Sequence, residues 1–317
     1  MQAAHLFVGL DVGGTNTAVL VTDEHGQAVA EITLPTQANS PQVLLNSLSE
    51  AIHTALAKAN ATPPHIRRIG LGVPGHVDPA TGIVHLAVNL NLQMYPLGQA
   101  LGVRFKSPIY LENDVRTAAI GTYEHLYKTK SVQDIAYLSI GTGIAAGVIL
   151  NGRLHRGSNG LAGEIGHVVV EPGGALCNCG LRGCLETIVS GPAILRQFAQ
   201  IDPDANKDGR TPADIYRLAT EGHPAAQTVV QHVSQHLAQA IHRLLMLYDV
   251  EKVVLGGGVT HSGAAFFQPI LQALTQLRRQ SPLAESLLRE EKLHLLPTNF
   301  NPGAWGAIHL ARNGIPR

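Results

Sequence analysis

The 317-residue sequence is poor in the residue types that nucleic-acid-binding and membrane-surface proteins use. Aromatic residues make up 4% and charged residues 15% of the chain, and no basic run is longer than a pair. Lys plus Arg and Asp plus Glu both number 23, so the formal net charge is zero. The sequence therefore lacks the basic surface that follows phosphates and the rings that stack on bases. We expect neither a nucleic acid nor an anionic membrane as a partner.

Long apolar runs are missing too, and the first ten residues contain no Lys or Arg. A membrane-spanning helix needs about 20 consecutive apolar residues, and a secretory signal needs a basic start. The three cysteines lie in one short segment, which is not the arrangement of a disulfide framework. We therefore expect a cytoplasmic protein, and its length suffices for two α/β domains.

Hydrophobic periodicity predicts a mixed α/β fold. A pattern of strand, Gly/Thr turn and strand occurs around Asp11–Thr22 and again around Ile135–Leu150. This recurrence predicts two related domains that face each other across a cleft, with ligands between them. Strands are expected at 5–10, 17–22, 29–34, 66–73, 108–111, 134–140, 145–150, 252–255 and 294–297, and helices at 41–59, 230–248 and 303–313.

All three cysteines and a nearby histidine form one candidate metal site, which consists of His167, Cys177, Cys179 and Cys184. Three thiolates and one imidazole make a four-coordinate zinc set with no open position, so we expect a structural Zn²⁺. A lone histidine is more often structural, and the cysteines are what favour the metal. Glu164 and Glu186 flank the cluster and are not needed as ligands, which leaves both carboxylates able to accept hydrogen bonds from hydroxyl groups.

Three glycine turns follow predicted strands. Asp11-Val-Gly13-Gly14-Thr15-Asn16 lies between two strands, and therefore lacks the helix that must follow a Rossmann or Walker loop. Its N–H groups and hydroxyl can still face a phosphate, and Asp11 can hold Mg²⁺ through water. Each turn alone could be a plain tight turn. Together with Gly141-Thr142-Gly143 and Gly256-Gly257-Gly258, the set is better explained by one nucleotide that the backbone approaches closely.

The segment Glu112-Asn113-Asp114 places an acid and an amide where a strand ends and a helix begins. One interpretation makes Asp114 a helix N-cap, which is the commoner role for such a residue. The other makes Asp114 a general base that removes a proton from a substrate hydroxyl, with Asn113 holding that substrate.

In this order, the motifs resemble the ROK family of bacterial sugar kinases and repressors. The resemblance is most specific through Leu161–Gly191, in Ala-Gly-Glu164-Ile-Gly-His167, in the cysteine segment with Leu185-Glu186, and in Ser190-Gly191. It implies an α/β, two-domain, actin-like (ribonuclease H-like) fold with an interdomain cleft. The implied domains are a small one, 1–113 plus 301–317, and a large one, 114–300, which carries the zinc loop.

The resemblance also implies roles for single residues. Asp114 falls on the family's catalytic base, and His167 would bind zinc with one ring nitrogen and face the sugar with the other. Asn16 stands where many members have Lys. The implied nucleotide-binding residues are Asp11, Gly13, Gly14, Thr15, Asn16, Gly141, Thr142, Gly143, Gly256, Gly257 and Gly258, and the implied sugar-binding residues are Gly75, Asn89, Asn113, Asp114, Glu164, His167 and Glu186.

These residues predict an ATP- and Mg²⁺-dependent hexokinase that phosphorylates the 6-hydroxyl of a hexose, with glucose favoured. N-acetylhexosamine, fructose, mannose and allose stay open as substrates, because small differences in loop shape decide among them. A sugar-sensing repressor is a weaker alternative, since only ten residues precede Asp11. An actin-like ATPase or chaperone would have no use for Glu164, His167 and Glu186. The family resemblance favours a homodimer or homotetramer.

Overall fold

The computed structural model of the chain describes residues 5–128, 131–204 and 209–315 and divides into two compact units. Unit 1 comprises Met1–Gln133, Gly147–Ala162 and Asn301–Arg317, and unit 2 comprises Asp134–Ala146 and Gly163–Phe300. This division differs from the predicted domain ranges in two segments, 114–133 and 147–162, which cluster with unit 1. The first does so because its helix packs on the C-terminal helix of the chain.

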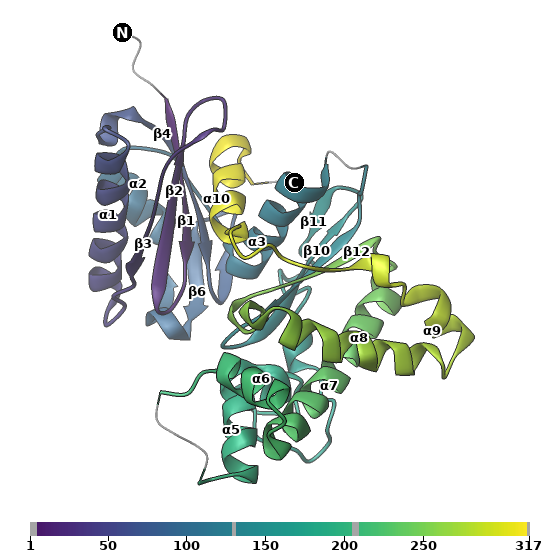
Figure 1. Cartoon of the computed structure of the whole chain (residues 1–317). Coiled ribbons are helices and arrows are strands. Elements are labelled where there is room, and N and C mark those ends of the chain that lie inside the picture. Colours follow the sequence, from purple (N-terminus) through teal and green to yellow (C-terminus); the bar gives the residue numbers. More distant parts are fainter. Residues whose placement is uncertain (1–4, 129–130, 205–208, 316–317) are drawn as a thin grey trace. The chain divides into compact units, whose positions relative to one another are not determined.

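Runs of strands and helices follow one another along the chain (Figure 1). The strands are β1 (Leu6–Val12), β2 (Asn16–Thr22), β3 (Ala28–Pro35), β4 (Ile66–Val73), β5 (His76–Asp78), β6 (Ile83–Ala87), β7 (Leu92–Tyr95), β8 (Ile109–Asn113), β9 (Ile135–Ile140), β10 (Ile144–Leu150), β11 (Arg153–His155), β12 (Lys252–Gly256) and β13 (Leu293–Leu295). The helices are α1 (Pro41–Lys58), α2 (Leu97–Phe105), α3 (Asp114–Thr122), α4 (Glu186–Val189), α5 (Gly191–Ile201), α6 (Pro212–Thr220), α7 (Pro224–Tyr248), α8 (Ala264–Arg278), α9 (Pro282–Leu287) and α10 (Pro302–Asn313).

The first sheet has the strand order β3-β2-β1-β4-β8. β1 pairs antiparallel with β2 and parallel with β4, and β4 pairs parallel with β8. The carboxyl ends of β1, β4 and β8 therefore share one edge of the sheet. Helix α1 covers one face, and α3 and α10 cover the other (Figure 1). Residues that follow these three strands are brought together at that edge.

The two faces of β1 explain how the helices are held. Val8 and Leu10 are fully buried in the core beneath α1, while Phe7 belongs to a second cluster with α10. Such alternation is what a strand covered on both faces requires. A Cβ on Gly9 would lie 2.7 Å from the carbonyl oxygen of Ala304, so α10 packs directly on the backbone of β1. This close contact brings the start of α10 near the end of β1.

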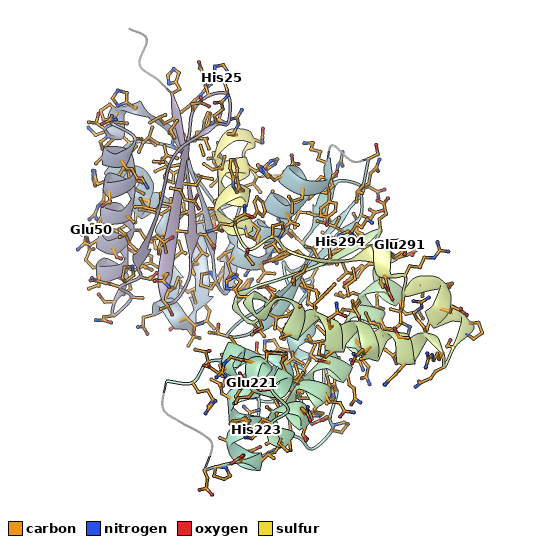
Figure 2. The ribbon with its side chains drawn as sticks, viewed as in Figure 1. His25, Glu50, Glu221, His223, Glu291 and His294 are labelled. Atoms are coloured by element: carbon orange, nitrogen blue, oxygen red, sulfur yellow. The ribbon has the colours of Figure 1, made fainter. Side chains whose placement is uncertain are left out.

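Helix α1 shows why its sequence forms a helix here. The Ser40 hydroxyl caps its start by accepting the Val43 N–H at 3.3 Å. Leu44, Leu48 and their neighbours at helical spacing are buried, and Glu50 points away from the sheet (Figure 2). The predicted helix over 41–59 is confirmed to within one residue.

The second sheet has the order β11-β10-β9-β12-β13, and the boundary between the units runs through β10. β12 pairs parallel with both β9 and β13, which places Gly256 opposite Ser139. Helices α5 to α8 belong to unit 2, where α7 packs on α5, α6 and α8. A small sheet, β5-β6-β7, precedes α2 and is absent from the expected elements. Within the described residues, no helix combines the length and the apolar character that crossing a membrane requires.

Candidate functional site

The first glycine turn is a tight hairpin between β1 and β2. The Gly13 N–H donates to the Asn16 carbonyl at 2.9 Å, and Gly14, Thr15 and Asn16 are exposed. A Cβ on Gly14 would lie 3.2 Å from the Cβ of Asn89, so Asn89 stands beside this turn. The predicted hairpin is therefore present, and exposed N–H groups and a hydroxyl in such a turn suit an anionic group.

Asp11, at the end of β1, is held against the start of α10. A Cβ on Gly303 would lie 2.3 Å from the Asp11 Cγ, so only glycine leaves room for this carboxylate. Burial and, second, the nearby charge of Asp114 raise the pKa of Asp11 from 3.8 to about 7. The two carboxylates therefore interact, and a bound cation would relieve their repulsion.

At the junction of β8 and α3, Asn113 and not Asp114 is the N-cap. Asn113 Oδ1 accepts the Arg116 N–H at 3.1 Å, and its Nδ2 donates to the Gly75 carbonyl at 3.1 Å. The N-cap interpretation of Asp114 was wrong, because Asp114 is the first residue of the helix and its Oδ1 accepts the Val115 N–H. The amide of Asn113 thus joins the ends of β4 and β8 and places Asp114 at the same edge as Asp11.

Glu112 supports this junction, and sequence reasoning gave it no role. Its side chain is fully buried and pairs with two guanidinium groups, Arg116 Nε at 3.0 Å and Arg156 Nε at 2.6 Å. Glu112 Oε1 also accepts the Asn113 N–H at 2.9 Å. Two cations around one buried carboxylate balance its desolvation only while all three groups are present. The i, i+4 spacing of Glu112 and Arg116 is the one sequence signal that could have indicated this pair.

In unit 2, the other two glycine turns lie side by side. A Cβ on Gly141 would stand 3.9 Å from the Gly258 nitrogen, as expected for turns that follow neighbouring parallel strands. Gly257 has φ +94°, and a side chain there would meet the Ile140 carbonyl at 2.5 Å. Gly141 also accepts the Gly191 N–H at 2.7 Å, which fixes the turn to the start of α5. The predicted nucleotide residues of unit 2 thus gather at one sheet edge.

The predicted sugar-binding residues of unit 2 lie along the start of β10. Glu186 Oε2 accepts the Ile144 N–H at 3.2 Å. The short 3₁₀ turn η5 (Ile165–His167) lies beside the same residue, because a Cβ on Gly166 would be 2.2 Å from the Ile144 carbonyl. Glu164 immediately precedes this turn, and its carbonyl accepts the His167 N–H. The structure therefore attaches Glu164, His167 and Glu186 to one strand start.

The four predicted metal ligands come together. All four ligand atoms lie within 4.8 Å of one another. The Cys177 Sγ to His167 Nδ1 distance is 3.5 Å, and the Cys179 Sγ to Cys184 Sγ distance is 3.6 Å. Tetrahedral zinc would place such pairs about 3.5 and about 3.8 Å apart. The donor geometry fits a zinc ion, the sulfur separation is too long for a disulfide, and Nε2 of His167 is left for another group.

Without a bound cation, burial opposes the ionisation of the thiol groups in this cluster. Burial raises the pKa of Cys184 to about 12, and its hydrogen bonds with Cys179 and Cys177 add to the shift. The Leu181 backbone N–H lowers the pKa of the exposed Cys179. Zinc binds thiolates, so a bound ion would supply the charge that ionises the buried sulfurs.

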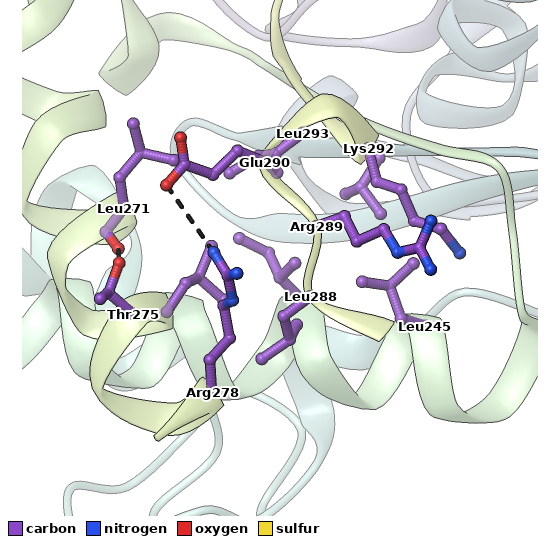
Figure 3. Close-up of a pocket in the computed structure, with 12 residues that line it drawn as sticks. Leu245, Leu271, Thr275, Arg278, Leu288, Arg289, Glu290, Lys292 and Leu293 are labelled. Carbon is purple, nitrogen blue, oxygen red and sulfur yellow. Dashed lines mark hydrogen bonds and ion pairs between the residues drawn. The ribbon is translucent and has the colours of Figure 1, made fainter. Parts of the chain in front are cut away.

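A separate depression of unit 2 does not qualify as a ligand site (Figure 3). It lies between α7, α8 and the segment before β13, and Arg278 Nη1 lies 3.9 Å from Glu290 Oε1 there. Its cavity of about 10 Å³ holds about one water molecule, and its lining includes Leu245, Leu271 and Leu288. None of the predicted site residues lines it.

The sequence is similar to the ROK family and to individual proteins of known function. The sequence pattern of the ROK family matches residues 7–313. A glucokinase of Halalkalibacterium halodurans is 34% identical over 280 residues, which cover 84% of each chain. A xylose repressor of Caldicellulosiruptor bescii is 29% identical over 85% of this chain and 70% of its own length. A kinase and a repressor therefore both match most of this chain.

The fold also matches that of a solved structure from the same family. A ROK family glucokinase from Streptomyces griseus, in complex with glucose and AMPPNP, superposes with a TM-score of 0.80 and 28% identity. The alignment covers 98% of this chain and all of that one. The predicted α/β, two-domain, actin-like fold is thereby confirmed.

Proposed function

The chain belongs to the ROK family, and we propose that it is an ATP-dependent hexokinase that phosphorylates the 6-hydroxyl of glucose. Kinship with glucokinases supports a sugar kinase. The observation that carries the proposal is the placement of Asp114 at the edge where β1, β4 and β8 end, next to Asp11 and the Gly13–Gly14 turn. A base, a cation-binding carboxylate and exposed N–H groups at one edge are what phosphoryl transfer requires.

In this proposal, Asp114 takes the proton of the 6-hydroxyl as that oxygen bonds to the γ-phosphorus of ATP. The bond from the γ-phosphorus to the β,γ-bridging oxygen breaks, and ADP leaves with those electrons. Asn113 and Gly75 orient the sugar beside this base. Asp11 is the residue that would hold Mg²⁺, which supplies positive charge against the phosphates when bound. Both carboxylates must be ionised for these roles, and they then repel each other. A bound cation would relieve this repulsion.

Unit 2 contributes the remaining assignments of the proposal. Glu164, Glu186 and His167 Nε2 accept or donate hydrogen bonds to ring hydroxyls, which orients the sugar. The Gly141–Gly143 and Gly256–Gly258 turns bind phosphate and adenosine. Cys177, Cys179, Cys184 and His167 Nδ1 would hold a structural zinc ion that fixes the orientation of the His167 ring. The reduced thiols that such a site needs are consistent with a cytoplasmic location.

A repressor function is the second candidate, because relatives such as the xylose repressor carry the same family pattern. The acidic pair Asp11 and Asp114 argues for catalysis, since a sugar sensor needs no base beside a cation site.

An ADP-release assay coupled to NADH oxidation, run on a panel of hexoses, tests the proposal. We expect ADP release that depends on sugar, the highest kcat/KM for glucose, and a product that glucose-6-phosphate dehydrogenase oxidises. A higher kcat/KM for mannose, fructose, allose or an N-acetylhexosamine would replace glucose as substrate. Sugar binding without ADP release would favour the repressor, and ADP release without any sugar would indicate an ATPase.

A further inference from the structure

A second group of metal-type ligands lies in unit 2, apart from the cysteines. Glu171, His232 and His236 place one carboxylate oxygen and two ring nitrogens within 4.8 Å of one another. The two histidines are four residues apart on α7 and therefore lie on the same face of that helix. Glu171 comes from the loop between His167 and Cys177. We propose that these three residues bind a divalent transition-metal ion, with Zn²⁺ as its most suitable occupant, at a second site. The site goes beyond the proposed kinase function and does not depend on it.

The hydrogen bonds around His232 fix which of its nitrogens carries the proton. The Gln197 Nε2 group donates to the carbonyls of Ile188 and Ala193, at 2.6 and 3.1 Å. Its Oε1 atom is therefore the one that lies 2.7 Å from His232 Nδ1. An amide oxygen only accepts, so Nδ1 of His232 is the donor. In the neutral ring, Nε2 then carries a lone pair.

His236 is oriented in the same way by the backbone. Its Nδ1 lies 3.0 Å from the carbonyl oxygen of His232, which also only accepts. In the neutral ring, Nε2 of His236 then presents a lone pair. A ring whose Nδ1–H is held by an acceptor and whose Nε2 is bare is the usual arrangement of a metal-binding histidine.

Both Nε2 atoms face the same carboxylate oxygen. Glu171 Oε1 lies 2.7 Å from Nε2 of His232 and 3.4 Å from Nε2 of His236. Two ring nitrogens and one carboxylate oxygen therefore converge on one point. A proton on His232 can satisfy only one of the two contacts, whereas a cation satisfies both.

The distances suit a first-row metal. Ligand bonds of 2.0 to 2.2 Å in a tetrahedral site put neighbouring N and O atoms about 3.4 Å apart. The Glu171–His236 distance of 3.4 Å already has this value, and the Glu171–His232 distance of 2.7 Å must lengthen by about 0.7 Å. Two imidazoles and one carboxylate are donors that zinc, among divalent ions, accepts readily.

The surroundings leave coordination positions open. The His236 side chain is only 12% exposed, while Glu171 and His232 are more exposed and line a pocket of about 560 Å³. Three protein ligands beside such a pocket leave a fourth position for water, unlike the closed set of the cysteine site. The Glu171 N–H donates to the Gly183 carbonyl at 3.1 Å, next to Cys184, so the loop that carries the carboxylate is firmly held. His223, the N-cap residue of α7, is not a member of this group.

Metal stoichiometry of the full-length chain tests the site. The chain and its His232→Gln/His236→Gln variant are equilibrated with Zn²⁺, freed of excess and assayed by mass spectrometry of the metal. We expect the wild-type chain to hold one more equivalent of zinc than the double variant. His242→Gln, on the same helix but outside the group, serves as the matched control and should keep the wild-type value. Glu171→Gln should weaken binding at this site at least tenfold.

Cobalt spectra separate the new site from the cysteine site and report on folding. Co²⁺ at the cysteines gives thiolate-to-metal charge-transfer bands, which the double variant should retain if it is folded. A further equivalent in the wild-type chain should add only d–d bands, because its ligands lack sulfur. Equal stoichiometry in the wild-type chain and the double variant would overturn the proposal. So would binding that is seen only at millimolar metal and is unaffected by the substitutions, which would mean an adventitious ion only.

Discussion

Glu186 Oε2 accepts the N–H of Ile144 at 3.2 Å, and the same oxygen lies 2.6 Å from the point where a Cβ on Gly143 would stand. The glycine turn after β9 and the carboxylate at the start of α4 are therefore in direct contact. One belongs to the proposed nucleotide site and the other to the proposed sugar site. A substitution at either residue should therefore alter the binding of both the nucleotide and the sugar.

Gly143→Ala tests this contact. The added methyl group must displace the Glu186 carboxylate, so we expect kcat/KM for the sugar to fall at least tenfold, a loss of about 1.4 kcal/mol in transition-state stabilisation. Gly102→Ala in α2 is the matched control, because the nearest atoms to its new Cβ lie at an ordinary 3.6 Å. Steady-state kinetics of both variants decide the matter, and wild-type kcat/KM in Gly143→Ala would disprove the coupling.

The raised pKa of Asp11 predicts a pH dependence of stability. Because the folded state holds this proton more tightly than the unfolded state, the stabilisation is complete below about pH 4 and is lost as the pH rises through about 7. Over that window the free energy of unfolding should fall relative to Asp11→Asn, by at most about 4 kcal/mol. Urea unfolding of both proteins at several pH values, without nucleotide or Mg²⁺, measures the difference. Parallel pH profiles would contradict the expectation.

Glu112→Gln should destabilise unit 1. The substitution leaves the guanidinium groups of Arg116 and Arg156 without their buried counter-charge, and breaking such a group costs about 3 to 5 kcal/mol. Glu221→Gln removes an exposed partner of Arg217 and is the control; its unfolding midpoint should barely move. Denaturant unfolding gives both values. Equal midpoints for the two variants would show that the buried group adds no stability.

Cys177→Ser tests the cysteine site. The substitution removes one of the four proposed zinc ligands, so the chain should lose an equivalent of zinc. Because bound zinc stabilises the folded state, we expect the melting temperature to fall by about 5 °C or more. Elemental analysis and calorimetry on the purified chain provide the test. An unchanged zinc content in the variant would show that the cysteine site does not bind zinc as proposed.

The sequence predicts the local features of this protein well. The β1–β2 hairpin, the helix over 41–59 and the grouping of His167 with the three cysteines follow from periodicity and donor chemistry, which act over short distances in the chain. The glycine turns were also found, and at Gly257 a positive φ and a close backbone contact leave few other residue types. These predictions needed no knowledge of tertiary packing.

Contacts between residues far apart in the sequence could not be predicted. Arg156 reaches Glu112 from 44 residues away, and Glu171 meets His232 from a distance of 61 residues. The small β5–β7 sheet was missed because its short strands offer little alternation to detect. The alternative that made Asp114 the N-cap was wrong, because Asn113 caps the helix, and either residue type caps a helix equally well.

Turnover of Asp114→Asn tests the central claim most directly. The amide keeps the shape of the side chain, and its oxygen can still accept the Val115 N–H, but it cannot take a proton from the sugar. We predict that kcat falls at least 100-fold, while the dissociation constant for glucose measured by calorimetry changes by less than about threefold. A kcat within tenfold of the wild-type value would contradict the assignment of Asp114 as the base.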